Sequence, residues 1–553
     1  MNQSVGGRLI KVESPAAGYA AADTTAREKL LKDLQNPFYI GDQPGATEST
    51  GWVDAWTSAP SAYAIAAQTT DDVVAGVNFA RTNNLRLVVK GGGHSYLGGS
   101  NAPDSLLIWT RAMNKVVLHD SFVAQGCTDH QSPQPAVTVE SGAMWIDAYH
   151  AVTVEGGRYV QGGGCTTVGV AGLIQGGGFG SFSKKFGMAA AGLLEAEIVT
   201  ADGEIRIANA CTNPDLFWAI KGGGGGTFGI VTKLTLRTRE LPDFFGAVFA
   251  TIQAKSDTAF RDLLHEFIDF YRDHLFNPHW GETVSCRGTN ELAITMVFQG
   301  LAKSEVEALW NPFFDQIKKS PDKYTIAFDP IILALPAQKF WDAAFLKKYL
   351  PQAVSLDSRQ GAPEKHYWWE NDTAEIGRYW HGYQSVWLPE TFLAKEETAK
   401  LVDALFSATR HWRVNFHFNK GLGGASPEEI AAARDTATNP AVLNAFALII
   451  IAGGGPPVYP SIADHEPDVT KARQNAIKMA QAMTELKKII PKSGSYVNET
   501  NYFEESWQES FWGPNYARLK TIKEKYDPTS LFFVHHGVGS ENWTPDGFTR
   551  LKT

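Results

Sequence analysis

The chain has 553 residues, of which 44% are hydrophobic and 20% charged, and its formal net charge is -9. This length suffices for two to four domains of a globular protein, and the negative charge argues against nucleic acid or an anionic membrane as the main partner. The longest apolar run, around residues 445–452, is much shorter than the ~20 residues that a membrane-spanning helix needs, so we expect no membrane segment.

The first 240 residues contain three glycine-dense segments, at 91–99, 162–180 and 222–229. In chain order the pattern predicts a helix over 70–83, a strand over 85–89, a strand over 137–139, a helix over 145–152, a strand over 194–200 and its hairpin partner over 205–207. Each glycine segment adjoins one of these elements, where backbone N–H groups approach a ligand without hindrance from a Cβ atom. Three such segments in one region favour a bound phosphate-containing ligand over flexible turns.

Two common nucleotide sites do not match this pattern. The phosphate-binding motif G-x-x-x-x-G-K-[ST] is absent, which argues against a nucleoside triphosphatase. A G-x-G-x-x-G match occurs at Gly224, Gly226 and Gly229, but a predicted helix over 215–221 precedes it and a predicted strand over 230–236 follows. The dinucleotide fingerprint needs the reverse order, so we interpret the match as spurious and exclude a standard Rossmann dehydrogenase.

After residue 240 the glycine clusters end and a second domain is predicted. Its first half alternates predicted strands (244–253, 291–300) with predicted helices (258–273, 304–319). Further on, a strand over 414–419 places Asn415, His417 and Asn419 on one polar face. A helix is expected to end at Tyr526, before Pro528.

The four cysteines and the histidine pair near the C-terminus give no metal site. Cys127, Cys165, Cys211 and Cys286 form no C-x-x-C pair, which excludes the usual zinc and thioredoxin patterns, and they do not resemble a disulfide framework. The adjacent His535 and His536 have no third ligand at metal-site spacing, so no bound metal is expected.

Five segments together carry a resemblance to a known family: residues 89–98 around His94, 161–169 around Cys165, 176–180, 215–224 and 512–519. They resemble, in order and over nearly the whole chain, the berberine bridge enzyme-like branch of the vanillyl-alcohol oxidase flavoprotein family. The resemblance implies a two-domain α+β fold. An FAD-binding domain (1–240) would be completed by a returning C-terminal segment (496–553), and a substrate domain (241–495) would be an antiparallel β-sheet covered by helices.

The resemblance also implies FAD held by two covalent links, His94 to the flavin 8α-methyl and Cys165 to C6. With Cys165 so committed, at most one disulfide can form. The other positions implied to contact FAD are Gly91, Gly92, Gly93, Ser95, Gly98, Val168, Gly169, Gly172, Gly176, Gly177, Ile230, Asn515 and Tyr516. Val168 stands where the family gates oxygen, and its small side chain is similar to that of oxidases. Leu173 departs from the histidine of plant members.

On the substrate side, relatives use a tyrosine of a Tyr-x-Asn-Tyr motif as general base, and this chain has Glu499 in its place. An ionised Glu499 could take the proton of an alcohol; alternatively it caps a local turn. His417 or Asn415 could orient a substrate hydroxyl, and Tyr383 could wall the pocket.

These features predict an FAD-dependent oxidase that transfers hydride from a carbohydrate or secondary-metabolite alcohol to flavin N5 and is reoxidised by O₂ to give H₂O₂. The alternatives are oxidative ring closure and a flavoprotein with a degenerate, non-catalytic pocket. The expected partners are a small-molecule substrate and O₂, with a monomer expected. An extracytoplasmic location is favoured by family habit, and the substrate is not specified.

Overall fold

The computed structural model describes residues 1–459 and 462–551. Its N-terminal part begins with a small sheet in the order β1-β4-β6-β5, formed by β1 (Leu9–Lys11), β4 (Tyr63–Ala66), β5 (Leu87–Lys90) and β6 (Leu106–Trp109). Helix α3 (Thr70–Thr82) connects β4 to β5, and a capping box between Thr69 and Asp72 fixes its start. The first glycine segment (91–99) begins directly after the last residue of strand β5.

A second, antiparallel sheet follows in the order β11-β10-β12-β8-β7. Its strands are β7 (Val116–Phe122), β8 (Gln134–Glu140), β10 (Leu193–Val199), β11 (Ile205–Asn209) and β12 (Ile230–Glu240), and β9 (Arg158–Val160) pairs with the end of β12. A disulfide joins Cys127 to Cys211, so one pair forms and Cys165 and Cys286 remain free thiols.

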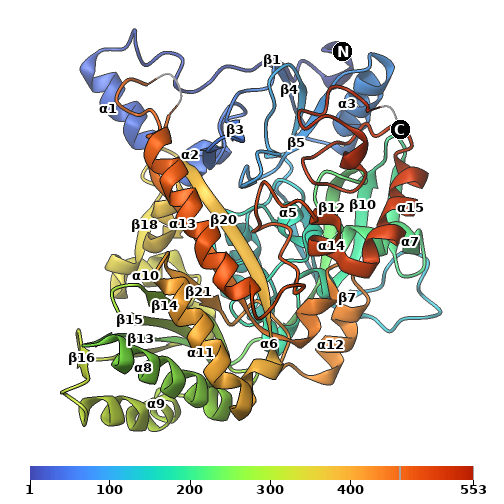
Figure 1. Ribbon diagram of the computed structural model, residues 1–553. Coiled ribbons are helices and arrows are strands. Elements are labelled where there is room, and N and C mark those ends of the chain that lie inside the picture. The colour runs from blue at the N-terminus through green and yellow to red at the C-terminus, as the bar shows by residue number, and fades with distance from the viewer. Residues whose placement is uncertain (460–461, 552–553) are drawn as a thin grey trace.

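The largest sheet has the antiparallel strands β13 (Phe244–Ala254), β14 (Trp280–Arg287), β15 (Glu291–Gln299), β20 (Arg378–Pro389), β21 (Val414–His417) and β22 (Ala445–Pro457), with β16 (Tyr324–Ile326) and β17 (Ile331–Pro336) at one edge. Figure 1 shows four helices on one side of it: α8 (Asp257–Phe270), α9 (Lys303–Lys318), α11 (Lys395–Thr409) and α13 (Val469–Lys487). Their apolar side chains share one core with the strands. The opposite face meets the N-terminal part, where the Phe179 and Trp387 rings lie 5.6 Å apart.

Two strands from the N-terminal part extend this sheet. Strand β2 (Ser49–Trp52) pairs in parallel with β20, and β3 (Trp56–Thr57) pairs with β2. Residues 49–57 therefore belong to the large sheet although they precede residue 240. The predicted domain boundaries at residues 240 and 495 assigned residues 49–57 to the FAD-binding domain. These boundaries remain a prediction.

The C-terminal segment lies against the N-terminal part (Figure 1). Phe532 forms a parallel bridge with Leu87, and Lys523 donates to the carbonyls of Thr227 (2.6 Å) and Phe532 (2.7 Å). The remaining elements are α1 (Thr24–Asp33), α2 (Pro37–Gly41), α4 (Trp145–Tyr149), α5 (Val170–Gln175), α6 (Ser183–Phe186), α7 (Pro214–Ile220), α10 (Ala343–Tyr349), α12 (Pro427–Arg434), α14 (Trp507–Trp512), α15 (Tyr516–Tyr526), β18 (Val354–Leu356) and β19 (Tyr367–Trp369).

The predicted elements differ from the observed ones mainly at their ends. The helix predicted over 145–152 is the short α4 continued by a π-helical turn to Glu155, and the strand predicted over 414–419 stops at His417. Across residues 1–459 and 462–551, no helix combines the length and apolar character needed to span a bilayer.

Candidate active site

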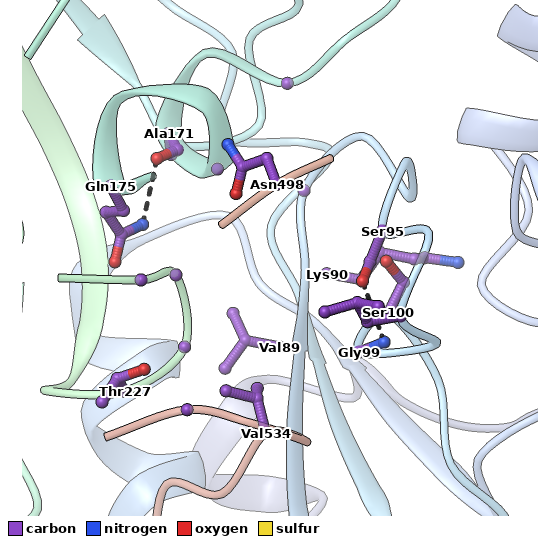
Figure 2. A pocket seen from close by; sticks show the side chains of 18 of the residues that line it. Val89, Lys90, Ser95, Gly99, Ser100, Ala171, Gln175, Thr227, Asn498 and Val534 are labelled. Carbon is purple, nitrogen blue, oxygen red and sulfur yellow. Dashed lines mark hydrogen bonds between the residues drawn. The ribbon is translucent and has the colours of Figure 1, made fainter. Parts of the chain in front are cut away.

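A cavity of about 310 Å³ lies where the three glycine segments meet the C-terminal segment. Its walls include residues 87–100, residues 168–175 with α5, the glycine segment 224–229, and residues 496–499 and 532–537. In Figure 2 Ala171 and Gln175 of α5 lie on one side of the view, and Ser95, Gly99 and Ser100 lie on the other. Ser95 Oγ accepts a hydrogen bond from the Gly99 N–H at 3.0 Å, which closes the loop after His94.

The loops that carry His94 and Cys165 touch through glycine main chain. A Cβ atom on Gly92 would lie 2.7 Å from the Gly169 nitrogen, and a Cβ atom on Gly169 would lie 2.9 Å from the Gly92 nitrogen. Only glycine permits this approach without moving backbone, since real Cβ contacts are almost never below 3.0 Å. The two segments are therefore held at a fixed spacing.

Three buried polar atoms on the cavity wall have no hydrogen-bond partner in the described part of the chain. They are Ser141 Oγ, Thr227 Oγ1 and His536 Nδ1. Because an unpaired buried polar atom costs free energy, each indicates a place where a ligand supplies the missing partner. With the backbone N–H groups of the glycine segments and the apolar side chains of Val89, Ile230 and Val534, these residues fit FAD.

His94 lines the cavity and is a neutral imidazole. Burial lowers the pKa of His94 to about 4, and a hydrogen bond to the backbone of Thr167 opposes part of that shift. Its Nε2 lies 4.0 Å from Oε2 of Glu48. A neutral imidazole keeps a lone pair on one ring nitrogen, which is the state that a nucleophile needs.

Cys165 is half-buried, and its Sγ lies 3.4 Å from Thr167 Oγ1. Cys165 is not among the residues that line the cavity. Burial, and then the charge of Asp372, raise the pKa of the Cys165 thiol well above its usual range. Burial and then Glu375 raise the pKa of Asp372 to about 7. The Cys165 thiol is therefore kept in its neutral form by this environment, with the Asp372 carboxyl nearby.

Glu499 occupies the cavity wall and its backbone closes a turn. Its N–H donates to the Tyr496 carbonyl at 2.9 Å, and its own carbonyl accepts from Ser385 Oγ at 2.5 Å. The carboxylate accepts two hydrogen bonds from Lys420 Nζ, at 2.6 and 2.5 Å. The Glu499 backbone therefore takes part in the turn while the residue lines the cavity, and its role as general base remains a prediction.

Three further residues that were predicted to be catalytic lie on the largest sheet and do not line the cavity. Asn415 accepts from Ser285 Oγ at 2.7 Å. Burial and then Lys420 lower the pKa of His417 well below its usual value, and its Nδ1 has no partner in the described residues. Tyr383 stacks on Tyr96 at 5.1 Å. Burial raises the pKa of Tyr383 well above its usual value, so its hydroxyl stays protonated.

A group of buried carboxyls near these residues was missed from the sequence. Glu375 accepts a 2.8 Å hydrogen bond from Tyr96 Oη, and Ser181 Oγ donates to Glu282. Burial is the main cause of a raised pKa at Glu375 and Glu282, and it raises the pKa of Glu48 to about 8. These single acidic residues are far apart in sequence, so only the fold brings them together. Among these acids, only Glu282 has a positive φ, of 62°, and this angle is visible in the structure but not in the sequence.

The predicted cofactor positions divide into two sets. Those that line the cavity are Gly91, Gly92, Gly93, His94, Ser95, Val168, Gly169, Gly172 and Ile230. Among the others, Gly98 packs on Trp56, and Gly176 and Gly177 pack on Asn498 and Thr438. Asn515 donates to the Thr438 carbonyl at 2.8 Å and Tyr516 to Glu541 at 2.6 Å. These five residues have structural contacts instead, so their cofactor role stays a prediction.

The G-x-G-x-x-G match has the element order that was predicted, with α7 before it and β12 after it. Gly224, Gly226 and Gly229 all line the cavity, as expected of the third glycine-dense segment. His535 and His536 also belong to the wall, and they stack on each other at 3.8 Å.

Comparison with known proteins gives two family matches. The FAD binding domain model matches residues 60–209, and the berberine and berberine like model matches residues 495–539. FAD-linked oxidoreductase easE of Arthroderma benhamiae is 32% identical over 491 residues, which cover 87% of this chain and 89% of that protein.

Solved structures share the fold. VAO-type flavoprotein MtVAO615 from Myceliophthora thermophila C1 aligns with a TM-score of 0.78 and 25% identity, covering 99% of this chain and 95% of its own. Glucooligosaccharide oxidase from Acremonium strictum, described with a 6-S-cysteinyl, 8α-N1-histidyl FAD, aligns with a TM-score of 0.65 and 20% identity over 87% and 92% of the two chains. The predicted two-domain α+β fold is confirmed.

Proposed function

The chain belongs to the berberine bridge enzyme-like branch of the vanillyl-alcohol oxidase flavoprotein family and is an FAD-dependent oxidoreductase; on this premise we propose that it is a bicovalent flavin oxidase of alcohols. The observation that carries the proposal is that one cavity brings together the loop that carries His94, the segment at Gly169 that contacts this loop, and Glu499. When bound, FAD would accept the hydride of an alcohol C–H bond, which carries that bond's two electrons, and would pass the two electrons to O₂, giving H₂O₂.

The attachment of FAD rests on the two loops that meet at Gly92 and Gly169. His94 and Cys165 hold the cofactor covalently, and the glycine segments and Ser95 hold its phosphates through backbone N–H groups. The likeness to an enzyme described with cysteinyl and histidyl links to FAD supports this proposal. Val168 lies on the cavity wall, where its small side chain leaves O₂ a path.

The substrate's hydroxyl proton goes to Glu499. Its carboxylate reaches the cavity, and Lys420 fixes its orientation with two hydrogen bonds. Tyr383 lies near the charge of Glu499 and His417 near that of Lys420, and together with Asn415, on the same strand as His417, they orient the hydroxyl in this proposal. Carboxyl oxygens accept hydrogen bonds from hydroxyl groups. The buried acids next to the site therefore favour a substrate with several hydroxyls, such as a carbohydrate or a hydroxylated secondary metabolite.

The test is an anaerobic screen in which flavin bleaching is followed with sugars and with aromatic and aliphatic alcohols. With the best substrate, Glu499→Gln should lower kcat/KM by roughly 100-fold or more, because glutamine keeps the shape but cannot take a proton.

Glu504→Gln is the matched control. Glu504 is also paired with a lysine and is 17% exposed, against 18% for Glu499, but it is not among the cavity-lining residues. Its kcat/KM should stay within about twofold of the parent, as surface substitutions away from special features usually do. Normal turnover in Glu499→Gln would remove Glu499 as the base. A flavin that no alcohol bleaches would contradict the oxidase.

A further inference from the structure

Main-chain contacts place Glu48 against His94. The Glu48 N–H donates to the Gly93 carbonyl at 3.1 Å, immediately before His94, and the Gly377 N–H donates to the Glu48 carbonyl at 2.9 Å. Upstream, the buried ammonium of Lys90 donates to the carbonyls of residues 43, 44 and 46, at 2.8, 2.6 and 2.9 Å. Strand β5, which leads to His94, thus also holds the loop that presents Glu48.

The Glu48 side chain is only 4% exposed, and its Oε2 lies 4.0 Å from His94 Nε2. Within the described residues, its carboxyl receives no hydrogen bond, unlike that of Glu375, which Tyr96 engages. A carboxyl buried without a compensating hydrogen bond is unfavourable, so its presence beside His94 points to a function. Burial first, and then Glu375 and Asp372, raise the pKa of Glu48 to about 8, so the carboxyl is half ionised near pH 8 and accepts a proton more readily as the pH rises through neutral.

We propose that Glu48 is the positioning residue for flavin attachment: it fixes the tautomer of His94 and accepts the Nε2 proton while Nδ1 bonds to the flavin 8α-methyl carbon. The proposal rests on the proposed function, specifically on the His94 link. Nε2 is the ring nitrogen nearest the Glu48 carboxyl, so we place the single proton of the neutral ring on Nε2 and the lone pair on Nδ1, the other ring nitrogen. The arrangement follows the logic of a nucleophile activated by an adjacent base.

The step balances as follows. A bond forms between Nδ1 and the 8α-methyl carbon, and one C–H bond of that methyl breaks. The methyl C–H proton and the Nε2 proton are released, the latter to Glu48. The two electrons of the C–H bond reduce the flavin ring, and O₂ takes them up with two protons as H₂O₂. The chain therefore links its own cofactor with no oxidant beyond O₂.

The experiment uses the full chain, purified without flavin and then reconstituted with FAD, in a Cys165→Ala background, so that His94 provides the sole covalent link. Glu48→Gln keeps the side-chain shape but cannot accept a proton. Protein is incubated aerobically with added FAD, and the rate at which flavin becomes resistant to acid precipitation is measured. We expect that rate to fall at least tenfold, a conservative figure for loss of proton transfer, while total bound flavin and the melting temperature stay near those of Cys165→Ala.

Glu504→Gln in the same background is the control, since Glu504 is a lysine-paired acid that does not line the cavity. It should link flavin at the parent rate. Glu48→Asp, which retains a proton acceptor, should link faster than Glu48→Gln. If Glu48 were merely structural, both Glu48 variants would lose bound flavin and thermal stability together.

Parent-rate linkage in Glu48→Gln, or equal rates in Glu48→Gln and Glu48→Asp, would overturn the role of Glu48 and leave the His94 link standing. If Cys165→Ala alone releases all its flavin in acid, the His94 link of the proposed function fails, and the role of Glu48 fails with it.

Discussion

Gly92→Ala tests the contact between the two cofactor-linking loops. The added Cβ would meet the Gly169 nitrogen at 2.7 Å and its Cα at 3.1 Å, whereas ordinary contact begins at 3.4 Å. The loops must therefore separate by about 0.7 Å, because the contacted atoms are main chain and no side-chain rotation relieves them. Overpacking of this kind costs about 1–3 kcal/mol.

The functional effect should exceed the loss of stability. In the proposed bicovalent enzyme, His94 and Cys165 must reach the 8α-methyl carbon and C6 of one rigid flavin, so a shift of this size should let one link form at the expense of the other. Intact-protein mass spectrometry before and after proteolysis counts singly and doubly linked flavin, and thermal unfolding reports stability. We expect the doubly linked fraction to fall several-fold and the melting temperature to drop by a few degrees.

Gly192→Ala is the control, since a Cβ there meets no atom within 4 Å and Gly192 is not among the cavity-lining residues. It should behave as the parent in both measurements. Parent-like melting and full double linkage in Gly92→Ala would refute the inference that these loops are held at a glycine-only distance.

Three further predictions concern stability. Lys90→Met leaves the three buried carbonyls of the 43–46 loop unpaired, so it should cost on the order of 3 kcal/mol in denaturant unfolding, and an unchanged midpoint would contradict it. Although burial opposes it, hydrogen bonds from His366, Arg359 and Asn36 hold the pKa of Asp357 well below its usual range. The stability from Asp357 is therefore present above the ordinary aspartate pKa of about 4 and lost as pH falls toward the lower folded pKa. Asp357→Asn should cost roughly 3 kcal/mol near pH 7 and progressively less below about pH 4, and a cost independent of pH would refute this assignment. Replacing Cys127 and Cys211 together by serine should lower the free energy of unfolding by up to ~4–5 kcal/mol, since the bridge spans 84 residues; a reductant should then lower the melting temperature of the parent but not of the variant.

The sequence predicted the features that depend on local patterns. Helix α3 was found from its apolar period and its acidic first turn, and strands β13, β15 and β21 of the large sheet were predicted close to their observed positions. The glycine segments were found because a close backbone approach excludes every other residue type, as at Gly92 and Gly169. His94 and Glu499, both picked from sequence, lie on the wall of one cavity.

What the sequence did not reveal depends on proximity between distant segments. Glu48, Asp372 and Glu375 are single acids in loops, and their significance arises only where the fold buries them beside His94 and Cys165. The pairing of β2 with β20 was missed because the four residues Ser49–Trp52 include a glycine and carry no strand period.

The central claim is that FAD is held by two covalent links, and acid precipitation tests it directly. Flavin should remain in the protein pellet of the parent, of His94→Ala and of Cys165→Ala, because each single variant keeps one link. It should appear in the supernatant only when both residues are replaced. Release of the flavin from the parent protein would contradict the account.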